Sequence, residues 1–205
     1  RRNYKRSHHS SRGKGSGMII AGLQKTTLID YPGKISCTVF LAVCNFRCPW
    51  CYSGELVLPE KIKKQPRISE KEFFDFLKGR QGLLEGVVLC GGEPTVNKEL
   101  PAFAEKIKKM GFFVKLDTNG SNPEMLKDLI DKKLIDYVAM DIKAPIDSPI
   151  YKKIIGDGVS LEDIKKSVEI IKKLGVNGEF RTTVVPGIHK KEDFLEIAKW
   201  IGGEN

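Results

Sequence analysis

The sequence predicts an α/β protein built as a partial, open TIM-type β/α barrel with parallel strands and five to six β/α units. After Met18, short aliphatic or β-branched runs alternate with longer stretches of helical periodicity, the order typical of parallel strands joined by crossover helices. The chain has 205 residues. Because a closed eight-unit barrel typically needs about 250 residues, an open barrel is expected.

Five runs rich in Val, Ile, Leu and Phe predict the strands. Short apolar runs between turn-forming residues are typical of strands buried in a parallel sheet. In chain order the runs are 35–43 (ISCTVFLAV), 86–90 (GVVLC), 112–116, 137–142 and 179–185. No sequence for a further strand follows them.

A helix is expected after each strand, and local signals mark its ends. Ser69, with Glu72 three residues later, has the pattern of a capping box. Asn122-Pro123 is a helix start, and Gly111 is a helix stop. The expected helices are 69–78, 97–110, 122–133, 160–174 and one that begins near 191.

The positive charge is concentrated at the start of the chain. Of the formal net charge of +9, residues 1–17 contribute six Lys or Arg and no acidic residue. This segment has few apolar side chains, so we interpret 1–17 as a disordered, tag-like or basic leader, with a functional basic arm as the alternative. Residues 18–205 are expected to form one domain, either whole or truncated at its C-terminus. The domain itself is nearly balanced in charge, so no nucleic-acid partner is expected.

The sequence also bears on the compartment and on the cysteines. It contains no apolar stretch of about 18 residues and no signal-peptide pattern, so no membrane association and a cytoplasmic location are expected. The chain has five cysteines, three of them within eight residues. An odd number in this distribution does not suit a disulfide framework in a reducing cell. Metal binding is the better interpretation.

Unusual polar, glycine-rich or metal-binding residues follow every predicted strand. Crossover connections between parallel strands are right-handed, so the strand ends that precede helices share one face, and in β/α barrels that face carries the active site. The loop segments are 44–51, 91–94, 117–120, 141–143 and 185–189. The sequence therefore predicts that these five segments converge.

Cys44, Cys48 and Cys51 have the spacing C-x3-C-x2-C on one loop. Three thiolates so spaced can hold an iron–sulfur cluster and leave one iron open. A zinc site with Cys90 or His189 as a distant fourth ligand is the alternative. Cys37 and Cys90 are otherwise expected to be small buried strand residues.

The cysteine loop resembles that of the radical S-adenosylmethionine enzymes, whose C-x3-C-x-aromatic-C pattern is matched by Cys44, Cys48, Trp50 and Cys51. Within that superfamily, LIDYPG at 28–33 resembles the activating enzymes of anaerobic ribonucleotide reductase, with pyruvate formate-lyase activating enzymes as near relatives. One departure is Tyr52-Ser53, which stands where relatives commonly have His-Asn after the third cysteine.

The resemblance implies a [4Fe-4S] cluster and S-adenosylmethionine as cofactors. It implies that the three cysteines ligate the cluster and that the open iron is chelated by the methionine group. Glu93 and the glycines before it would then line the amino group. Taken alone, these glycines need only form a tight turn. The residues implied to line the cofactor are Trp50, Gly91, Gly92, Glu93, Asp117, Asn119, Lys143 and His189.

Asp117, Thr118 and Asp141 are similar to a monovalent cation site near the cofactor. Hard oxygen ligands of this kind suit a hard cation. The local alternative is that 117–120 is an Asx-type turn. His189, in the same way, is equally well explained as a surface histidine before a helix.

The activity that the resemblance implies is reductive cleavage of S-adenosylmethionine, followed by hydrogen abstraction from a backbone glycine of a partner. That partner would be a glycyl radical enzyme, anaerobic ribonucleotide reductase above all. Flavodoxin or ferredoxin would donate the electron, and oxygen must be absent. The alternatives are a radical enzyme acting on a deazapurine-like small molecule and a non-catalytic zinc-binding module.

Overall fold

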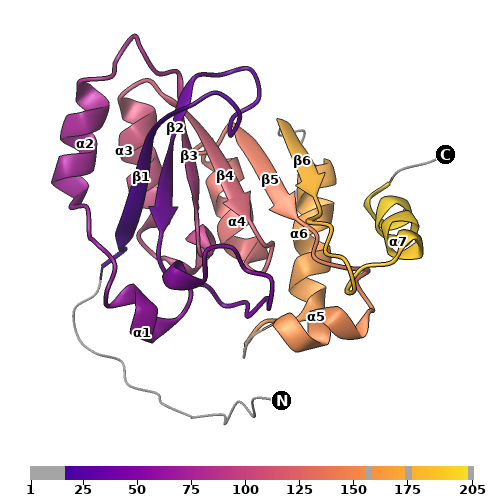
Figure 1. The fold of residues 1–205 in the computed structure, drawn as a ribbon. Coiled ribbons are helices and arrows are strands. Elements are labelled where there is room, and N and C mark those ends of the chain that lie inside the picture. Colours follow the sequence, from indigo (N-terminus) through magenta and orange to yellow (C-terminus); the bar gives the residue numbers. More distant parts are fainter. Residues whose placement is uncertain (1–16, 156–157, 174–176, 203–205) are drawn as a thin grey trace.

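A computed structural model describes residues 17–155, 158–173 and 177–202. Within them lies one sheet with the strand order β1-β2-β3-β4-β5-β6. β2 to β6 are parallel, and β1 pairs antiparallel with β2 (Figure 1). The strands are β1 (Ile20–Thr27), β2 (Ser36–Leu41), β3 (Gly86–Gly91), β4 (Phe113–Thr118), β5 (Tyr137–Asp141) and β6 (Asn177–Arg181).

Helices follow the parallel strands, as the crossover topology requires. They are α1 (Pro59–Ile62), α2 (Glu70–Lys78), α3 (Leu100–Lys109), α4 (Pro123–Asp131), α5 (Pro149–Ile154), α6 (Leu161–Lys173) and α7 (Lys191–Ile201). Two short 3-10 helices, η1 (Gly54–Leu56) and η2 (Pro94–Val96), lie in the loops after β2 and β3. The sheet is not closed, so the open barrel predicted from the sequence is confirmed.

The hydrophobic core lies between one face of the sheet and the helices behind it. Alternate strand residues such as Val39, Leu89, Leu116 and Val138 are fully buried, and neighbours in this row are paired in the register of the sheet. α2, α3, α4 and α6 cover this face (Figure 1). Their contribution to the same core cluster includes Phe73, Leu77, Phe103, Ile107, Leu126, Leu129, Ile164 and Val168.

The other face of the sheet carries polar and charged side chains. Because successive strand residues point to opposite faces, Thr38, Lys115, Asp117 and Glu179 lie on the inner side of the open barrel. Because the hydrophobic core is formed on the other face of the sheet, the polar side chains of the inner face are available to form a binding or catalytic site.

The loop between β1 and β2 closes the inner face at the amino ends of the strands. The Thr38 hydroxyl donates to the Asp30 carboxylate at 2.7 Å. Tyr31 is buried, with its ring centroid 5.8 Å from that of Tyr137. A Cβ on Gly86 would lie 2.9 Å from the Tyr31 ring, so only glycine leaves room for this side chain. The segment that suggested a subfamily therefore has a structural role far from the cysteines.

Most predicted elements are present with shifted ends. The Ser69 hydroxyl accepts from the Glu72 N–H at 3.1 Å, which is one half of the predicted capping box, and Asn122 caps α4 in the same way. The predicted helix at 97–110 begins only at Leu100, after η2. The strand predicted at 179–185 is observed at 177–181. It ends at Arg181 because the neighbouring strand, β5, ends at Asp141, with which Arg181 is paired.

Elements that the sequence did not predict are β1, α1, α5 and the two 3-10 helices. Within the described residues the parallel strands number five, as predicted, and the additional strand, β1, precedes them in the chain. The leader predicted at 1–17 falls, except for Gly17, outside the described residues, as does the predicted end of a helix at 174.

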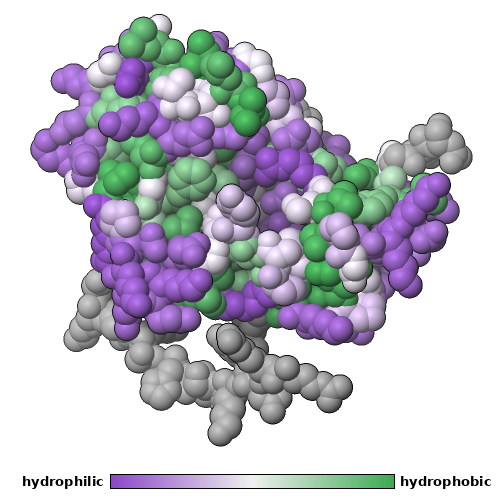
Figure 2. Space-filling view, in the orientation of Figure 1, coloured by the Kyte–Doolittle hydropathy of each residue, from purple (hydrophilic) through white to green (hydrophobic). Residues whose placement is uncertain are grey.

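Exposed hydrophobic side chains gather at the end of the sheet where the parallel strands begin. Figure 2 shows them along the upper rim, over the β1–β2 loop, where Leu28 and Ile29 are 72% and 87% exposed. Leu83 is exposed at the same end of the sheet. Among the helices that the structure describes, none has the length and hydrophobicity that a membrane crossing requires.

Candidate functional site

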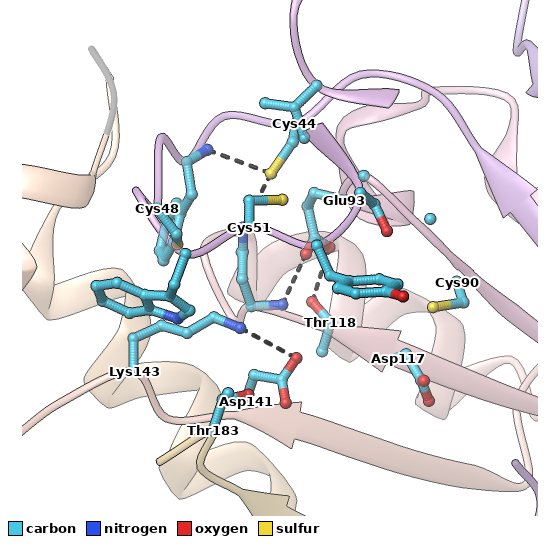
Figure 3. A pocket seen from close by; sticks show the side chains of 18 of the residues that line it. Cys44, Cys48, Cys51, Cys90, Glu93, Asp117, Thr118, Asp141, Lys143 and Thr183 are labelled. Atoms are coloured by element: carbon cyan, nitrogen blue, oxygen red, sulfur yellow. Dashed lines mark hydrogen bonds and ion pairs between the residues drawn. The ribbon is translucent and has the colours of Figure 1, made fainter. Parts of the chain in front are cut away.

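A pocket lies at the carboxyl ends of the parallel strands, where the sequence predicted convergence (Figure 3). Every β2-to-β6 strand end contributes to it. The predicted site residues that line it are Cys44, Cys48, Trp50, Cys51, Gly91, Gly92, Glu93, Asp117, Thr118, Asn119, Asp141 and Lys143. Cys90, which was considered only as a fourth ligand of the alternative zinc site, also lines the pocket, and further lining residues that were not predicted include Phe46, Tyr52, Arg181 and Thr183.

The cysteine loop is held by the residues between the first two cysteines. Phe46 is 2% exposed and packs in the hydrophobic core. The Arg47 guanidinium donates to the carbonyls of Cys44 and Phe46 at 2.7 and 2.8 Å, and the Arg47 N–H donates to Ile154 O. The Asn45 amide donates to the Ser121 hydroxyl at 2.8 Å. These contacts tie the loop to α5 through the Arg47 backbone, to the loop after β4 through the Asn45 side chain, and to itself through the Arg47 side chain.

Val43, directly before the first cysteine, has φ +77°. This left-handed conformation is strongly disfavoured for a β-branched residue, so it marks local strain. The Val43 N–H donates to Leu56 O at 2.8 Å, and its carbonyl accepts from the Glu93 N–H at 2.8 Å. These two bonds hold the strained turn that directs the chain out of β2 toward Cys44.

The three cysteines of the loop are free thiols facing one pocket (Figure 3). Cys44 and Cys48 are half-buried and Cys51 is exposed. Burial raises the pKa of the Cys44 thiol to about 12. Burial also raises the pKa of Cys48, and the ammonium of Lys143 acts in the opposite direction. Lys143 therefore favours the thiolate form that a metal ligand requires.

Gly91, the last residue of β3, and Gly92, which follows it, pack directly against the backbone at the end of β2. Gly91 has φ +122°, and a Cβ there would lie 2.2 Å from Leu41 O. A Cβ on Gly92 would lie 2.0 Å from Val43 O. Both glycines are thus needed for the close approach of the loop to the end of β2.

Glu93 is 1% exposed, and its carboxylate joins the loops after β3 and β4. One oxygen accepts from the Thr95 N–H and from the hydroxyls of Thr95 and Thr118 at 2.6 and 2.8 Å. The other accepts from the Asn119 N–H at 2.6 Å. Burial raises the pKa of Glu93, and these four donors oppose that rise. The carboxylate is therefore both a lining group and a structural bridge.

Asn119 links the loop after β4 to the cysteine loop. Its amide donates to the Asn45 side-chain oxygen at 3.0 Å, and its Nδ2 lies 3.9 Å from Cys44 Sγ. Its own side-chain oxygen accepts from the Ser121 N–H at 2.9 Å. An Asx turn is therefore present, but it is formed by Asn119 with Ser121 and not by Asp117, whose carboxylate pairs with Lys115 and Arg181.

Five charged side chains of alternating sign form a row that we call the charge ladder, and four of them line the pocket, Lys115 being the exception. Lys115 Nζ lies 2.6 Å from Asp117 Oδ1, and Arg181 Nη2 lies 3.1 Å from Asp117 Oδ2. Arg181 Nε lies 3.4 Å from Asp141 Oδ1, and Lys143 Nζ lies 3.1 Å from Asp141 Oδ2. Lys115 is 1% exposed, so its charge depends on Asp117 for compensation.

His189 lies outside the residues that line the pocket. Its Nδ1 accepts from the Val185 N–H at 3.0 Å, so the proton is assigned to Nε2, which lies 2.8 Å from Lys143 O. Its ring packs edge-on against Trp50 with centroids 5.7 Å apart. In this arrangement His189 joins the loop after β6 to Lys143 and Trp50. Its predicted cofactor contact stays a prediction.

The two remaining cysteines differ from each other. Cys37 is fully buried in the core, as expected. Cys90 was expected to be buried as well, but it is half-buried and lines the pocket, beside Asp117 and away from the three loop cysteines (Figure 3). The expectation failed because Cys90 is on the inner face of β3, whereas Cys37 points into the core.

Arg181 and Lys115 were missed by the sequence analysis. The one signal in the sequence that could have indicated them is that each is a charged residue within a predicted strand, where apolar residues alternate with polar ones. Arg181 was placed in mid-strand by the longer predicted strand, although it is the last residue of β6.

The fold and the site together define an open α/β barrel with a three-thiol pocket at the carboxyl ends of its parallel strands. The sequence-family model of the Radical SAM superfamily matches residues 38–201, so the chain belongs to that superfamily. This superfamily uses a [4Fe-4S] cluster and S-adenosylmethionine.

Sequence relatives of this chain have more than one function. A protein of Methanocaldococcus jannaschii named "Putative glycyl-radical enzyme activating enzyme MJ1227" is 38% identical over 191 residues, covering 89% of this chain and 75% of the relative. The 7-carboxy-7-deazaguanine synthase of Thermococcus kodakarensis is 28% identical over 185 residues, covering 82% of this chain and 69% of the relative.

Solved structures agree on the fold. The structure of Streptococcus suis SuiB bound to S-adenosylmethionine matches with a TM-score of 0.55 and 16% identity, over 77% of this chain. The match covers only 34% of the SuiB chain. It supports the barrel alone.

The donor set fits the cofactors of the superfamily. Cys44, Cys48 and Cys51 would hold the cluster, since thiolates are its usual ligands. The zinc alternative is set aside because the superfamily to which the chain belongs uses a [4Fe-4S] cluster.

Proposed function

We propose that this protein is an activating enzyme that generates a glycyl radical on a partner protein, with anaerobic ribonucleotide reductase as the first candidate partner. The observation that carries the proposal is the 38% identity over 191 residues to a relative named as a glycyl-radical enzyme activating enzyme. When bound, the cluster supplies the electron that cleaves S-adenosylmethionine to methionine and a 5′-deoxyadenosyl radical. Hydrogen transfer from a partner glycine would give 5′-deoxyadenosine and the glycyl radical.

The residues of this chain contribute position and shielding. Arg47, Phe46 and Asn45 fix the loop that presents the three thiols. Glu93 and Asn119 hold the neighbouring loops at fixed distances from Cys44. Loops that are held in place limit the movement of a reactive radical, which the protein must also protect from solvent.

The mouth of the pocket supports a protein substrate. Tyr52, which lines the pocket, is fully exposed, and Val43 after β2 and Val184 after β6 are 43% and 64% exposed. Exposed aromatic and apolar side chains on the face that carries a site are typical of surfaces that bind proteins. The departure at Tyr52 from the His of relatives thus fits a contact with a partner.

The small-molecule alternative rests on the similarity to 7-carboxy-7-deazaguanine synthase. It would place a deazapurine-like precursor over the charge ladder. Electron donation by flavodoxin or ferredoxin belongs to either function, so the donor does not distinguish them.

The test is anaerobic incubation of the reconstituted protein with dithionite, S-adenosylmethionine and anaerobic ribonucleotide reductase from the same organism. The expected result is an electron paramagnetic resonance doublet of a glycyl radical, with deuterium transfer into 5′-deoxyadenosine when the partner carries deuterated glycine. Cys48→Ala should abolish both signals. Release of 5′-deoxyadenosine that depends on a deazapurine precursor, with no radical on the partner, would refute the proposal.

A further inference from the structure

The carboxylates predicted to bind a monovalent cation already have cationic partners within the chain. Both oxygens of Asp117 are paired, with Lys115 at 2.6 Å and Arg181 at 3.1 Å. Both oxygens of Asp141 are paired, with Arg181 at 3.4 Å and Lys143 at 3.1 Å. The hydroxyl of Thr118 is directed to Glu93. The residues present therefore do not fit a free cation.

We propose that the guanidinium of Arg181 takes the place of a monovalent cation between Asp117 and Asp141, so that the enzyme needs no added cation. Arg181 contacts both carboxylates through different nitrogens, Nη2 and Nε. A planar guanidinium can bridge two carboxylates in this way, whereas a lysine ammonium is a single point charge. Arg181 is thus a positioning residue that fixes the two strand ends relative to each other.

The balance of charge supports this assignment. Three cationic side chains, Lys115, Lys143 and Arg181, face three carboxylates, because Glu179 lies 3.9 Å from Arg181 Nη1. A further cation would leave an unbalanced positive charge in a partly desolvated site, which is costly. Burial lowers the pKa of Arg181, but the surrounding carboxylates raise it further, so the group stays charged.

The register of the sheet explains why arginine can reach this position. Asp141 and Arg181 are the last paired residues of β5 and β6, and both lie on the inner face. Asp117 lies on the same face of β4, next to β5. A cation attached to β6 is present at full occupancy at any salt composition, whereas a free ion must be bound from solution.

The first test uses the metal-free protein, so it needs no enzymatic activity. Thermal unfolding is compared in KCl and in tetramethylammonium chloride at equal ionic strength. The wild type should show the same Tm in both salts. Arg181→Ala leaves two carboxylates facing each other, so K⁺ should raise its Tm by roughly 3–5 °C over tetramethylammonium, as expected for a ligand at about ten times its Kd.

Two further variants control the experiment. Lys108→Ala removes a comparable ion pair with Asp136 on the opposite side of the fold, and it should show no preference for K⁺. Arg181→Lys keeps the charge, so it should be less K⁺-dependent than Arg181→Ala. If Arg181→Ala does not fold, the inference is still tested by the wild type, whose Tm must be the same in both salts, and Arg181→Lys is then compared with the wild type.

The second test measures 5′-deoxyadenosine release from S-adenosylmethionine with dithionite and no partner protein. The wild-type rate should agree within about twofold between the two salts, and Arg181→Ala should lose at least about tenfold in tetramethylammonium and recover in K⁺. This readout needs only the cofactors of the superfamily, so it is independent of the proposed glycyl radical partner. K⁺ dependence of the wild type, or equal behaviour of Arg181→Ala in both salts, would overturn the inference.

Discussion

Gly92→Ala should destabilise the protein even when no cofactor is present. The added Cβ would lie 2.0 Å from Val43 O and 2.6 Å from Val43 C, whereas real Cβ contacts essentially never fall below 3.0 Å. The backbone at Val43 must therefore move by about 1 Å or the loop after β3 must withdraw. Either movement disturbs the turn that leads into Cys44.

The cost can be worked out from the contacts that are lost. The Gly92 N–H donates to Leu41 O at 2.7 Å and the Glu93 N–H donates to Val43 O at 2.8 Å. Weakening both bonds costs about 1 kcal/mol each. Overpacking adds about 1–3 kcal/mol, so the free energy of unfolding should fall by about 3–5 kcal/mol in total.

The assay is urea unfolding of the metal-free protein at 25 °C, with iron content after reconstitution as a second readout. Gly79→Ala is the matched control, because its φ is −72° and an added Cβ would only contact carbonyl oxygens at 3.5 and 3.8 Å. If Gly92 served only to let a ligand approach, Gly92→Ala would match Gly79→Ala in metal-free stability. That result would refute the reasoning.

Three other changes test the site. Arg47→Ala should change the free energy of unfolding by no more than about 1 kcal/mol but should speed iron loss to a chelator severalfold, because the Cys44 and Phe46 carbonyls lose their hydrogen-bond donor. Arg67→Ala, at an exposed position, is the control. Equal rates of iron loss from the two variants would contradict the role of Arg47 in holding the loop. Val43→Gly should stabilise the metal-free protein by about 1 kcal/mol by relieving strain at φ +77°, whereas Val184→Gly should not. Burial raises the pKa of Cys90 to about 12, so at pH 8 Cys90 should react with maleimide about a thousandfold more slowly in the folded than in the unfolded metal-free protein. Its labelling rate, measured by mass spectrometry, should also rise about tenfold per pH unit beyond pH 9. A rate that stays constant above pH 9 would exclude the raised pKa.

The convergence of the site was predictable because it depends on topology. Parallel strands with crossover helices bring every carboxyl end to one face, whatever the details of the loops. Cys44, Glu93 and Asp141 could therefore be grouped although they are far apart in the sequence. The same argument could not say how their side chains are paired.

The features that escaped prediction depend on pairing between distant segments. β1 reads IAGLQKTT, which has mixed composition, and it is a strand because β2 offers an antiparallel edge. The end of β6 at Arg181 is set by the end of β5 at Asp141. Arg181 became visible as a pocket residue only when that register was known.

The cysteine loop is fixed by residues that are not part of its motif. Phe46 lies in the core, Val43 is hydrogen-bonded to η1 and to Glu93, and the Arg47 N–H is hydrogen-bonded to α5. These contacts are all made between residues of the chain and need no ligand atom. When the chain folds, these contacts order the cysteine loop, so the entropy cost of ordering it does not fall on cluster binding. Mutations at Val43, Phe46 or Arg47 should therefore affect cluster binding although they change none of the three cysteine ligands.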